Sequence, residues 1–350
     1  MTSDWELFQK RAQLIGAVLA VILNSLVIHL VLKKSPKNLG VYKYLIIFTA
    51  AFEMAFAYLD IIVQPIFHSI GSTFVIIVNV QDSYLSWNIH MVLISLYCGF
   101  FGSLLALFSI QFLYRYWVVS GNKWLKSFKG FKILWWLLIP LISGSIWGFA
   151  AYFPCSPRPS SNEYMRHSFK EIFGLTVEQN VYVAPYFFEK HQNGTVQIYY
   201  PSFIAIIVDL TIINISNFTA FYYGFKCYHT LHTFNEVLPT SSQSYRNLQN
   251  QLFYSLVAQT MIPIFLMHIP VSTMFFCTFL EANVGHLTGI VTITIALFPA
   301  IDPLPTLFIV KNYRVALKNY IGLFLYKIAK VCLESADSTE TGTDINPRAT

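Results

Sequence analysis

Seven apolar stretches, each long enough to cross a lipid bilayer as a helix, dominate this chain of 350 residues. A helix needs about 20 predominantly apolar residues to span the hydrocarbon core. Only 11% of the residues are charged, compared with about 25% in a soluble domain. We therefore predict an all-α membrane protein, a bundle of seven transmembrane helices. The predicted spans are 12–32, 44–67, 89–114, 133–153, 203–225, 252–276 and 287–309.

Lysine and arginine residues collect in the connections on one side of this bundle. The connections after spans one, three and five and residues 310–332 after span seven hold sixteen of them, whereas the connections after spans two and six hold none. In the long loop between spans four and five, four basic residues are matched by four glutamates. Because positively charged loops stay in the cytoplasm, we expect residues 1–11 outside the cell and the C-terminus inside. The formal charge of +6 then marks one side of a bilayer, and we predict no nucleic-acid partner.

One glycosylation sequon falls in the long loop between spans four and five. Asn193-Gly194-Thr195 matches the acceptor pattern, and glycan transfer there requires an external loop. The matches that begin at Asn214 and Asn217 lie within span five, where the transferase does not reach. We therefore predict a glycan at Asn193.

Acidic side chains inside the spans are the first candidates for functional residues, because a charge in hydrocarbon is costly. Asp209 lies six residues into span five, about 9 Å below its outer edge. That depth suits the floor of a ligand pocket, and the alternative is a carboxylate that reaches for the interface. Glu53 and Asp60 share one face of span two. We interpret Glu53 as polar packing and leave Asp60 open between packing and ligand contact.

Three histidines, His90, His268 and His286, are predicted to lie near the outer mouth of the bundle. The first two, with two of the acids, give the candidate ligand pocket Asp60, His90, Asp209 and His268. The histidines are scattered, and no HExxH or paired-cysteine motif occurs, so we predict no metal site. No GxSxG, P-loop or Rossmann glycine pattern occurs either. We therefore predict that the chain is not an enzyme and has no cofactor.

Glycines in spans three and four favour close helix packing. Gly144 and Gly148 have the GxxxG spacing, and Gly99 and Gly102 lie in span three. Small residues at this spacing let helices approach closely. We favour packing inside the bundle over a dimer face.

The predicted cytoplasmic side carries an arginine and an amphipathic segment. Arg115 ends span three between Tyr114 and Tyr116. It is either an interface anchor at the helix C-terminus or a switch that changes partner when the bundle opens inward. After the seven-transmembrane domain, 12–310, residues 311–332 are predicted to form a short amphipathic helix along the inner leaflet. Cys332 is a candidate for palmitoylation, and the polar residues 333–350 are predicted to form a disordered cytoplasmic tail.

Three prolines and an aspartate interrupt span seven in Phe298-Pro299-Ala300-Ile301-Asp302-Pro303-Leu304-Pro305. Proline removes a backbone donor and kinks a helix. The carbonyl groups freed in this way must be satisfied by neighbours or water. We expect Asp302 to face the bundle interior, near Asn24 or a bound ion. A kinked polar segment suits a two-state element, and the alternative is a static kink filled by structural water.

Several of these stretches together resemble the nematode serpentine chemoreceptors of the Str and Srj classes, which are seven-transmembrane G-protein-coupled receptors. The resemblance covers about residues 10 to 330 and is carried by Leu39-Gly40-Val41-Tyr42-Lys43-Tyr44-Leu45, by Tyr114-Arg115-Tyr116-Trp117, and by Phe298 to Pro305 with Tyr313-Arg314. It implies detection of a small, often volatile odorant or pheromone-like ligand at the plasma membrane of sensory cilia. It also implies signalling to a heterotrimeric G protein, with Arg115, its neighbours Tyr114 and Tyr116, and Asp302-Pro303 in coupling.

The sequence departs from the wider receptor pattern at two positions. Tyr114 stands where an acid precedes the arginine, and Thr306 stands where a tyrosine follows the proline of span seven. An ion pair between Arg115 and its immediate neighbour is therefore excluded. The resemblance also implies a disulfide from span three, for which Cys98 and Cys155 are the candidates. They would bond only if the long loop dips into the bundle.

Two other functions compete with a receptor. The first is a ligand-gated cation channel of the insect odorant-receptor type. Such channels also have seven spans, but their N-terminus lies inside the cell, so the topology separates this hypothesis from the leading one. A small transporter is disfavoured, because an odd number of spans and the absence of an internal repeat do not fit two related halves.

Overall fold

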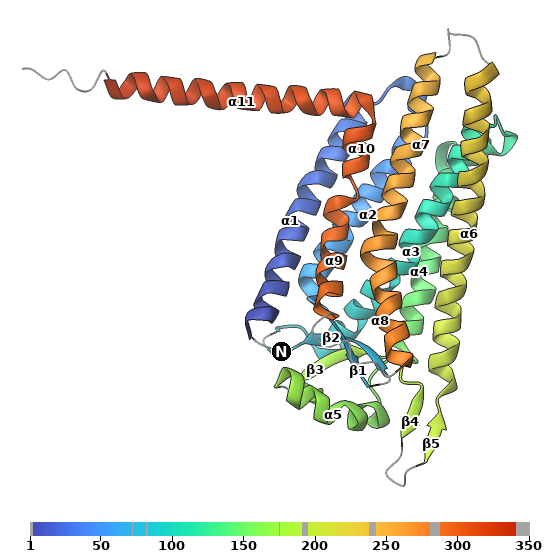
Figure 1. Ribbon diagram of the computed structural model, residues 1–350, viewed down its shortest axis with the longest axis vertical. Coiled ribbons are helices and arrows are strands. Elements are labelled where there is room, and N and C mark those ends of the chain that lie inside the picture. The colour runs from blue at the N-terminus through green and yellow to red at the C-terminus, as the bar shows by residue number, and fades with distance from the viewer. Residues whose placement is uncertain are drawn as a thin grey trace, which may run out of the picture.

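The computed structural model describes residues 3–71, 73–81, 83–174, 176–190, 195–237, 243–280 and 288–340. Within these residues, seven helical segments are long and apolar enough to cross a membrane, which confirms the predicted number of spans. Figure 1 shows them side by side in one bundle. They are α1 (Ser3–Lys34), α2 (Tyr42–Val63), α3 (Trp87–Val119), α4 (Ile133–Tyr152), α6 (Tyr200–Val237), α7 (Gln243–Pro263) continued by α8 (Ile269–Phe279), and α9 (Thr288–Ile301) continued by α10 (Leu304–Ile309).

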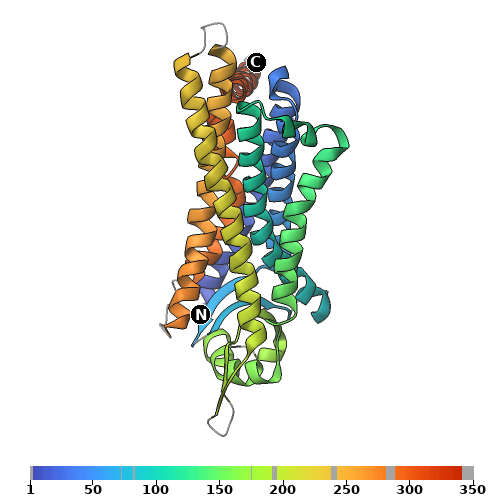
Figure 2. The same cartoon turned by 90° about the vertical axis from the view of Figure 1, so that its right-hand side faces the viewer.

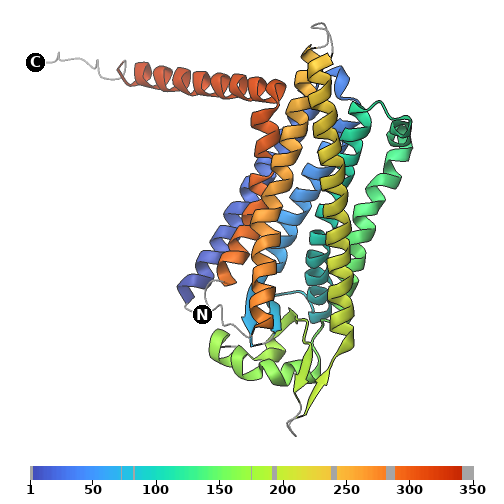
Figure 3. The same ribbon diagram turned by 45° about the vertical axis from the view of Figure 1, so that its right-hand side comes forward.

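Different elements cover the two ends of the bundle. At the strand end, as we call it, the connections form helix α5 (Pro159–Phe173) and the strands β1 (Ile66–Ile70), β2 (Thr73–Asn79), β3 (Asn180–Val183), β4 (Phe188–Lys190) and β5 (Val196–Ile198). At the opposite end, the α11 end, helix α11 (Lys311–Glu340) leaves the bundle sideways (Figures 1 and 3). The spans are therefore helical, as the all-α prediction states. The strands in the connections between them were not predicted.

Span two is shorter than predicted and ends at Val63 rather than at residue 67. Pro65 removes a backbone donor and disfavours helical geometry in the residue before it. That residue, Gln64, takes the left-handed conformation with φ 46° and closes the helix by donating its N–H to the Asp60 carbonyl at 2.8 Å. The apolar residues that follow belong to strand β1, which explains why the apolar stretch looked longer.

A three-stranded antiparallel sheet in the order β1-β2-β3 closes the strand end. Side chains alternate between its two faces. Phe74 and Ile76 pack with the core of the bundle, whereas Val75 and Ile77 pack with Met165 and others from α5. In Figure 2, α5 lies beyond the sheet, away from the spans. The sheet is therefore buried on both faces and forms a lid.

Spans six and seven are interrupted at prolines. After Pro263, a π-helical turn (Ile264–His268) joins α7 to α8. In span seven, Asp302 and Pro303 form a turn between α9 and α10. The predicted interruption of span seven is confirmed, whereas the turn in span six was not predicted.

Both terminal helices extend beyond the predicted boundaries. Helix α1 begins at Ser3, so residues 3–11 are helical. Helix α11 continues past residue 332 to Glu340, so the first part of the predicted tail is helical too, and residues 341–350 lie outside the described residues. Several apolar side chains of α11, including Ile321 and Phe324, are exposed.

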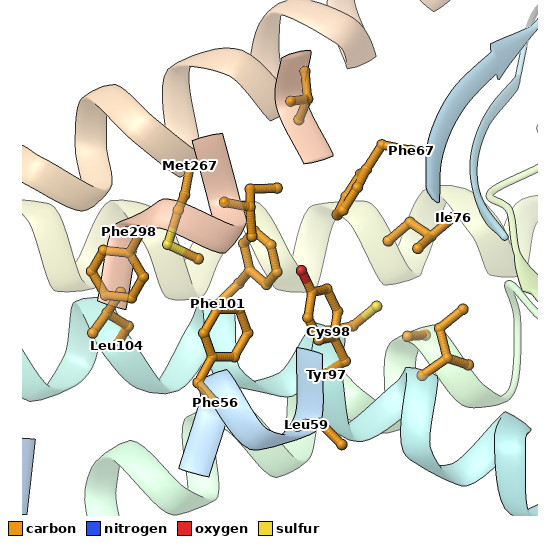
Figure 4. Packing of buried hydrophobic residues seen from close by; sticks show 14 of the residues in the cluster. Phe56, Leu59, Phe67, Ile76, Tyr97, Cys98, Phe101, Leu104, Met267 and Phe298 are labelled. Atoms are coloured by element: carbon orange, nitrogen blue, oxygen red, sulfur yellow. The ribbon is translucent and has the colours of Figure 1, made fainter. Parts of the chain in front are cut away.

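Helix α3 runs through the centre of the bundle and approaches α4 very closely. Its buried side chains, among them Tyr97, Cys98, Phe101 and Leu104, meet residues of α2 and of the strands in the main core (Figure 4). A Cβ atom added at Gly99 would lie 2.6 Å from the carbonyl oxygen of Gly144. The GxxxG spacing therefore serves packing within the bundle, as predicted.

This contact predicts that Gly99→Val destabilises the bundle. The new side chain would force α3 and α4 apart, and overpacking typically costs about 1–3 kcal/mol. We expect a lower melting temperature in detergent than for wild type. Gly322→Ala is the control, because an added Cβ at that α11 position meets nothing within 4 Å. Equal melting temperatures for Gly99→Val and Gly322→Ala would contradict the packing argument.

Candidate functional site

Arg115 lies inside the bundle near the α11 end, with 2% of its surface exposed. Its guanidinium lies over the Tyr42 ring of α2, 3.5 Å from the ring centroid. Its Nη1 donates a hydrogen bond of 2.8 Å to Oε1 of Gln249 in α7. Helix α3 continues beyond it to Val119. The interpretation of Arg115 as an interface anchor at a helix end is therefore wrong, and the side chain instead joins three helices.

The two tyrosines beside Arg115 face different neighbours. The Tyr114 ring stacks on Tyr42 with centroids 5.6 Å apart. The Tyr116 ring instead contacts Tyr223 of α6, also at 5.6 Å. Tyr114 therefore belongs to the Arg115 cluster, whereas Tyr116 packs against another helix.

Uncharged polar side chains extend the Arg115 cluster toward the middle of the bundle. The Tyr42 hydroxyl donates to Oε1 of Gln111 at 3.1 Å. Gln111 in turn donates through Nε2 to the Thr49 hydroxyl at 3.0 Å. These groups connect α2 and α3, and the amide of Gln111 uses both of its polar atoms.

A second polar cluster surrounds Asp302, which is fully buried. Gln259 of α7 donates through Nε2 to Oδ2 of Asp302 at 2.9 Å and accepts from the Thr306 hydroxyl at 3.1 Å. The carboxyl of Glu53 in α2 lies beside that of Asp302. Thr306, which replaces the tyrosine of the wider pattern, therefore takes part in the cluster.

Asn24 of α1 satisfies the backbone at the break in span seven. Its Nδ2 donates to the carbonyl oxygen of Pro299 at 2.9 Å. In an unbroken helix that carbonyl would accept from residue 303, but Pro303 has no N–H. The predicted rescue of a freed carbonyl by a neighbour is thus confirmed, although Asn24 pairs with the backbone rather than with the Asp302 carboxyl.

A small polar cavity links the two clusters. It measures about 10 Å³ and is lined by Asn24, Thr49, Glu53, Gln111, Gln259 and Pro303, with three apolar neighbours. This is about the space that one water needs. The sequence patterns predicted Asn24 and Glu53 as interior polar residues and missed Gln111 and Gln259.

A larger cavity of about 400 Å³ lies beneath the sheet, toward the strand end. Residues from the sheet, α3, α4, α6 and α8 line it, and most are apolar or aromatic. Figure 4 shows Phe67, Ile76, Cys98 and Phe101 of this lining. A small organic molecule fits a cavity of this volume.

The four predicted pocket residues occupy different places. Asp209 lines the cavity, and the His268 ring contacts Phe101 of the lining with centroids 6.3 Å apart. Asp60 lies beside the phenol of Tyr97. The ring Nε2 of His90 lies 2.7 Å from the Ser83 hydroxyl. Of the two acids, only Asp209 is therefore in the cavity wall.

Cys98 and Cys155 both line this cavity, but they are free thiols. The disulfide implied by the resemblance is therefore absent from the structure. The loop does dip inward, because Cys155 and Val183 of the loop pack in the same buried core cluster as Cys98. Burial, with the nearby charge of Asp209, raises the pKa of the Cys155 thiol to about 12. That thiol thus stays protonated at neutral pH.

Two predicted modification sites fall beyond what the structure describes. Asn193 lies outside the described residues, and Cys332 lies in α11 with a side chain outside them. Among the described residues, no group of three or more histidine, cysteine or acidic side chains is arranged to hold a metal.

Comparisons with known proteins cover nearly the whole chain. Residues 9–318 match the family described as serpentine type 7TM GPCR chemoreceptor Str. The chain is 36% identical over 315 residues to G-protein coupled receptor str-217 of Caenorhabditis elegans, which covers 90% of each protein. It is 26% identical over 317 residues to serpentine receptor class r-10 of the same species, covering 91% of this chain and 92% of that protein. Serpentine receptor class J-38 is 19% identical over 323 residues, covering 91% and 94%.

These matches decide between the competing functions. They favour a receptor over a channel or a transporter, and they agree with a multi-pass membrane protein that is not an enzyme. They also identify Str, rather than Srj, as the class to which the chain is more similar. The chain belongs to the Str family of serpentine seven-transmembrane G-protein-coupled chemoreceptors.

Proposed function

We propose that this receptor detects a small odorant or pheromone-like molecule at the plasma membrane of sensory cilia and activates a heterotrimeric G protein. The ligand occupies the cavity beneath the sheet, and the G protein binds at the α11 end. The observation that carries this proposal is the arrangement of an aromatic cavity and a buried, hydrogen-bonded arginine toward opposite ends of one bundle.

The charge distribution supports an outward-facing strand end. Lys33 and Lys34 end α1, and α11 carries further lysines, so basic residues collect at the α11 end. Positively charged segments favour the cytoplasmic side. At the strand end, Arg158 is paired with Glu189 at 2.6 Å, so this cation has a local partner. The exposed apolar side chains of α11 suit the inner leaflet.

The contacts of Arg115 support a role in coupling. One guanidinium nitrogen binds Gln249, but Nε and Nη2 are buried without a hydrogen-bond partner among the described residues. Unsatisfied buried donors are costly. A change in α7 that withdraws Gln249 would free the guanidinium to bind carbonyl or carboxylate groups of a G protein.

We predict that Arg115→Ala abolishes G-protein activation. The variant loses the guanidinium that we assign to G-protein coupling, while the cavity and its ligand contacts stay intact. Nucleotide exchange on purified G protein measures the effect, and surface labelling with a ligand-binding assay shows whether the variant folds. Lys318→Ala removes an exposed cation from α11 and serves as the control. Normal exchange in a well-expressed Arg115→Ala receptor would refute the role.

We predict that Asn193 carries a glycan. If the strand end faces outward, the loop between β4 and β5 is accessible to the glycosylation machinery. Digestion with a glycosidase should increase the mobility of the wild-type protein on a gel, and Asn193→Gln should remove this shift. Asn214→Gln is the matched control, because that sequon lies inside α6 and the variant should keep the shift. A glycan that persists in Asn193→Gln would count against the assignment.

A further inference from the structure

The cavity beneath the sheet contains a carboxyl group with an unused oxygen. Asp209 is only 9% exposed, and it lines the cavity. Its Oδ1 has no hydrogen-bond partner within the described residues. Arg158, at the same end of the bundle, pairs with Glu189 at 2.6 Å. A buried polar atom of this kind is costly unless something bonds to it, so the site favours a ligand that brings a donor.

The rest of the wall is complementary to hydrocarbon. Six aromatic residues from five different elements line it, namely Phe67, Phe74, Phe101, Trp147, Phe275 and Phe276. Apolar ligands gain free energy roughly in proportion to the surface they bury against such a wall. The ligand should therefore be an apolar body with one donor group.

The cavity opens toward lipid rather than through the strand end. The lid lies across the strand end, and its side chains over the cavity are buried, for example Phe67 at 1% exposure. In contrast, Leu210 of α6 and Phe276 of α8 line the cavity and are 49% and 64% exposed. Both residues belong to membrane spans, so their exposed surface faces hydrocarbon.

We propose that this cavity binds a small lipophilic alcohol, whose hydroxyl donates a hydrogen bond to Asp209 and whose hydrocarbon body packs on the aromatic wall. This ligand class rests on the proposed function, since it specifies what the receptor's cavity recognises. An alcohol fits better than an ammonium, because a route through lipid is unfavourable for a charged group. An ether or a hydrocarbon lacks the donor that Asp209 needs.

Four probes of matched shape test the ligand class: 3-phenylpropan-1-ol, its methyl ether, propylbenzene and 3-phenylpropylamine. Dissociation constants are obtained from the thermal stabilisation of purified receptor in lipid nanodiscs, without a G protein. One good hydrogen bond predicts that the alcohol binds about tenfold more tightly than the ether. Asp209→Leu should reduce the affinity for the alcohol to that for the ether and leave propylbenzene unaffected. Asp209→Asn keeps an acceptor oxygen and should retain part of the preference.

The outcomes are distinguishable. Equal affinity for alcohol and ether in the wild type, a preference that survives Asp209→Leu, or no binding of any probe would overturn the proposal. Tighter binding of the amine than of the alcohol would also overturn it and assign an ammonium ligand instead. Binding that follows the predicted order without G-protein activation would leave this proposal standing and would count against the proposed function alone.

The side opening carries a second inference, that the ligand enters from the bilayer between α6 and α8. Ser272 of α8 is exposed and lines the cavity, whereas its exposed neighbour Thr273 does not. Ser272→Phe should slow both association and dissociation of 3-phenylpropan-1-ol several-fold and leave the dissociation constant nearly unchanged. Thr273→Phe should match the wild type. The two rates are followed by the fluorescence of Trp147 in the cavity wall, with Trp147→Phe as the blank.

Unchanged rates in Ser272→Phe would overturn lateral entry. Slower association with unchanged dissociation would also overturn lateral entry. The ligand would then leave by a path that the new ring does not obstruct.

Discussion

The absence of water in the hydrocarbon core is the constraint on which this structure depends. Each backbone polar group inside a span needs a partner within the protein. Span seven breaks at Asp302-Pro303, and the break leaves the Pro299 carbonyl without its helical donor. Asn24 supplies the donor from α1. A side chain of the first span thus holds the seventh in its broken form, which gives Asp302 a fixed place in the interior.

Neutral amides then determine how firmly the interior is held. Gln259 bonds Asp302, and Gln249 bonds Arg115, so α7 contacts both ionisable groups through uncharged partners. Removing one partner of a buried ion pair typically costs about 3–5 kcal/mol, whereas a hydrogen bond to a charged group is worth about 1.5–3 kcal/mol. A glutamine therefore holds Arg115 less firmly than an acid would. This agrees with the coupling role that we propose for Arg115, in which the guanidinium changes its partner.

Sequence patterns predicted the spans well and the site only in part. Apolar length determines a span directly. Span two ended earlier than predicted, because Gln64-Pro65 stops the helix inside an apolar stretch that continues as β1. Other helices, such as α1 and α6, extend beyond their predicted spans. The lid was missed since its strands pair residues from two distant connections, Ile77 with Tyr182 for example. Arg115, Asp302 and Asp209 were found because a charge in a span is conspicuous. Gln249 and Gln259, the partners of Arg115 and Asp302, were missed because an amide in a helix resembles ordinary packing until its contacts are known.

Span six connects the two sites physically. Val271 and Phe275 of α8 line the cavity, and Gln249 of α7 holds Arg115. Between them lies the π-helical turn Ile264–His268, which follows Pro263. Such turns have a looser hydrogen-bond pattern than the α-helices on either side, so a shift of α8 can be absorbed there or passed to α7 as a rotation. A ligand that presses on Phe275 therefore acts on the same helical segment that positions Gln249. Coupling requires an element whose equilibrium both sites influence. We propose span six as that element, because it reaches both sites and is interrupted between them, whereas α3 is one continuous helix.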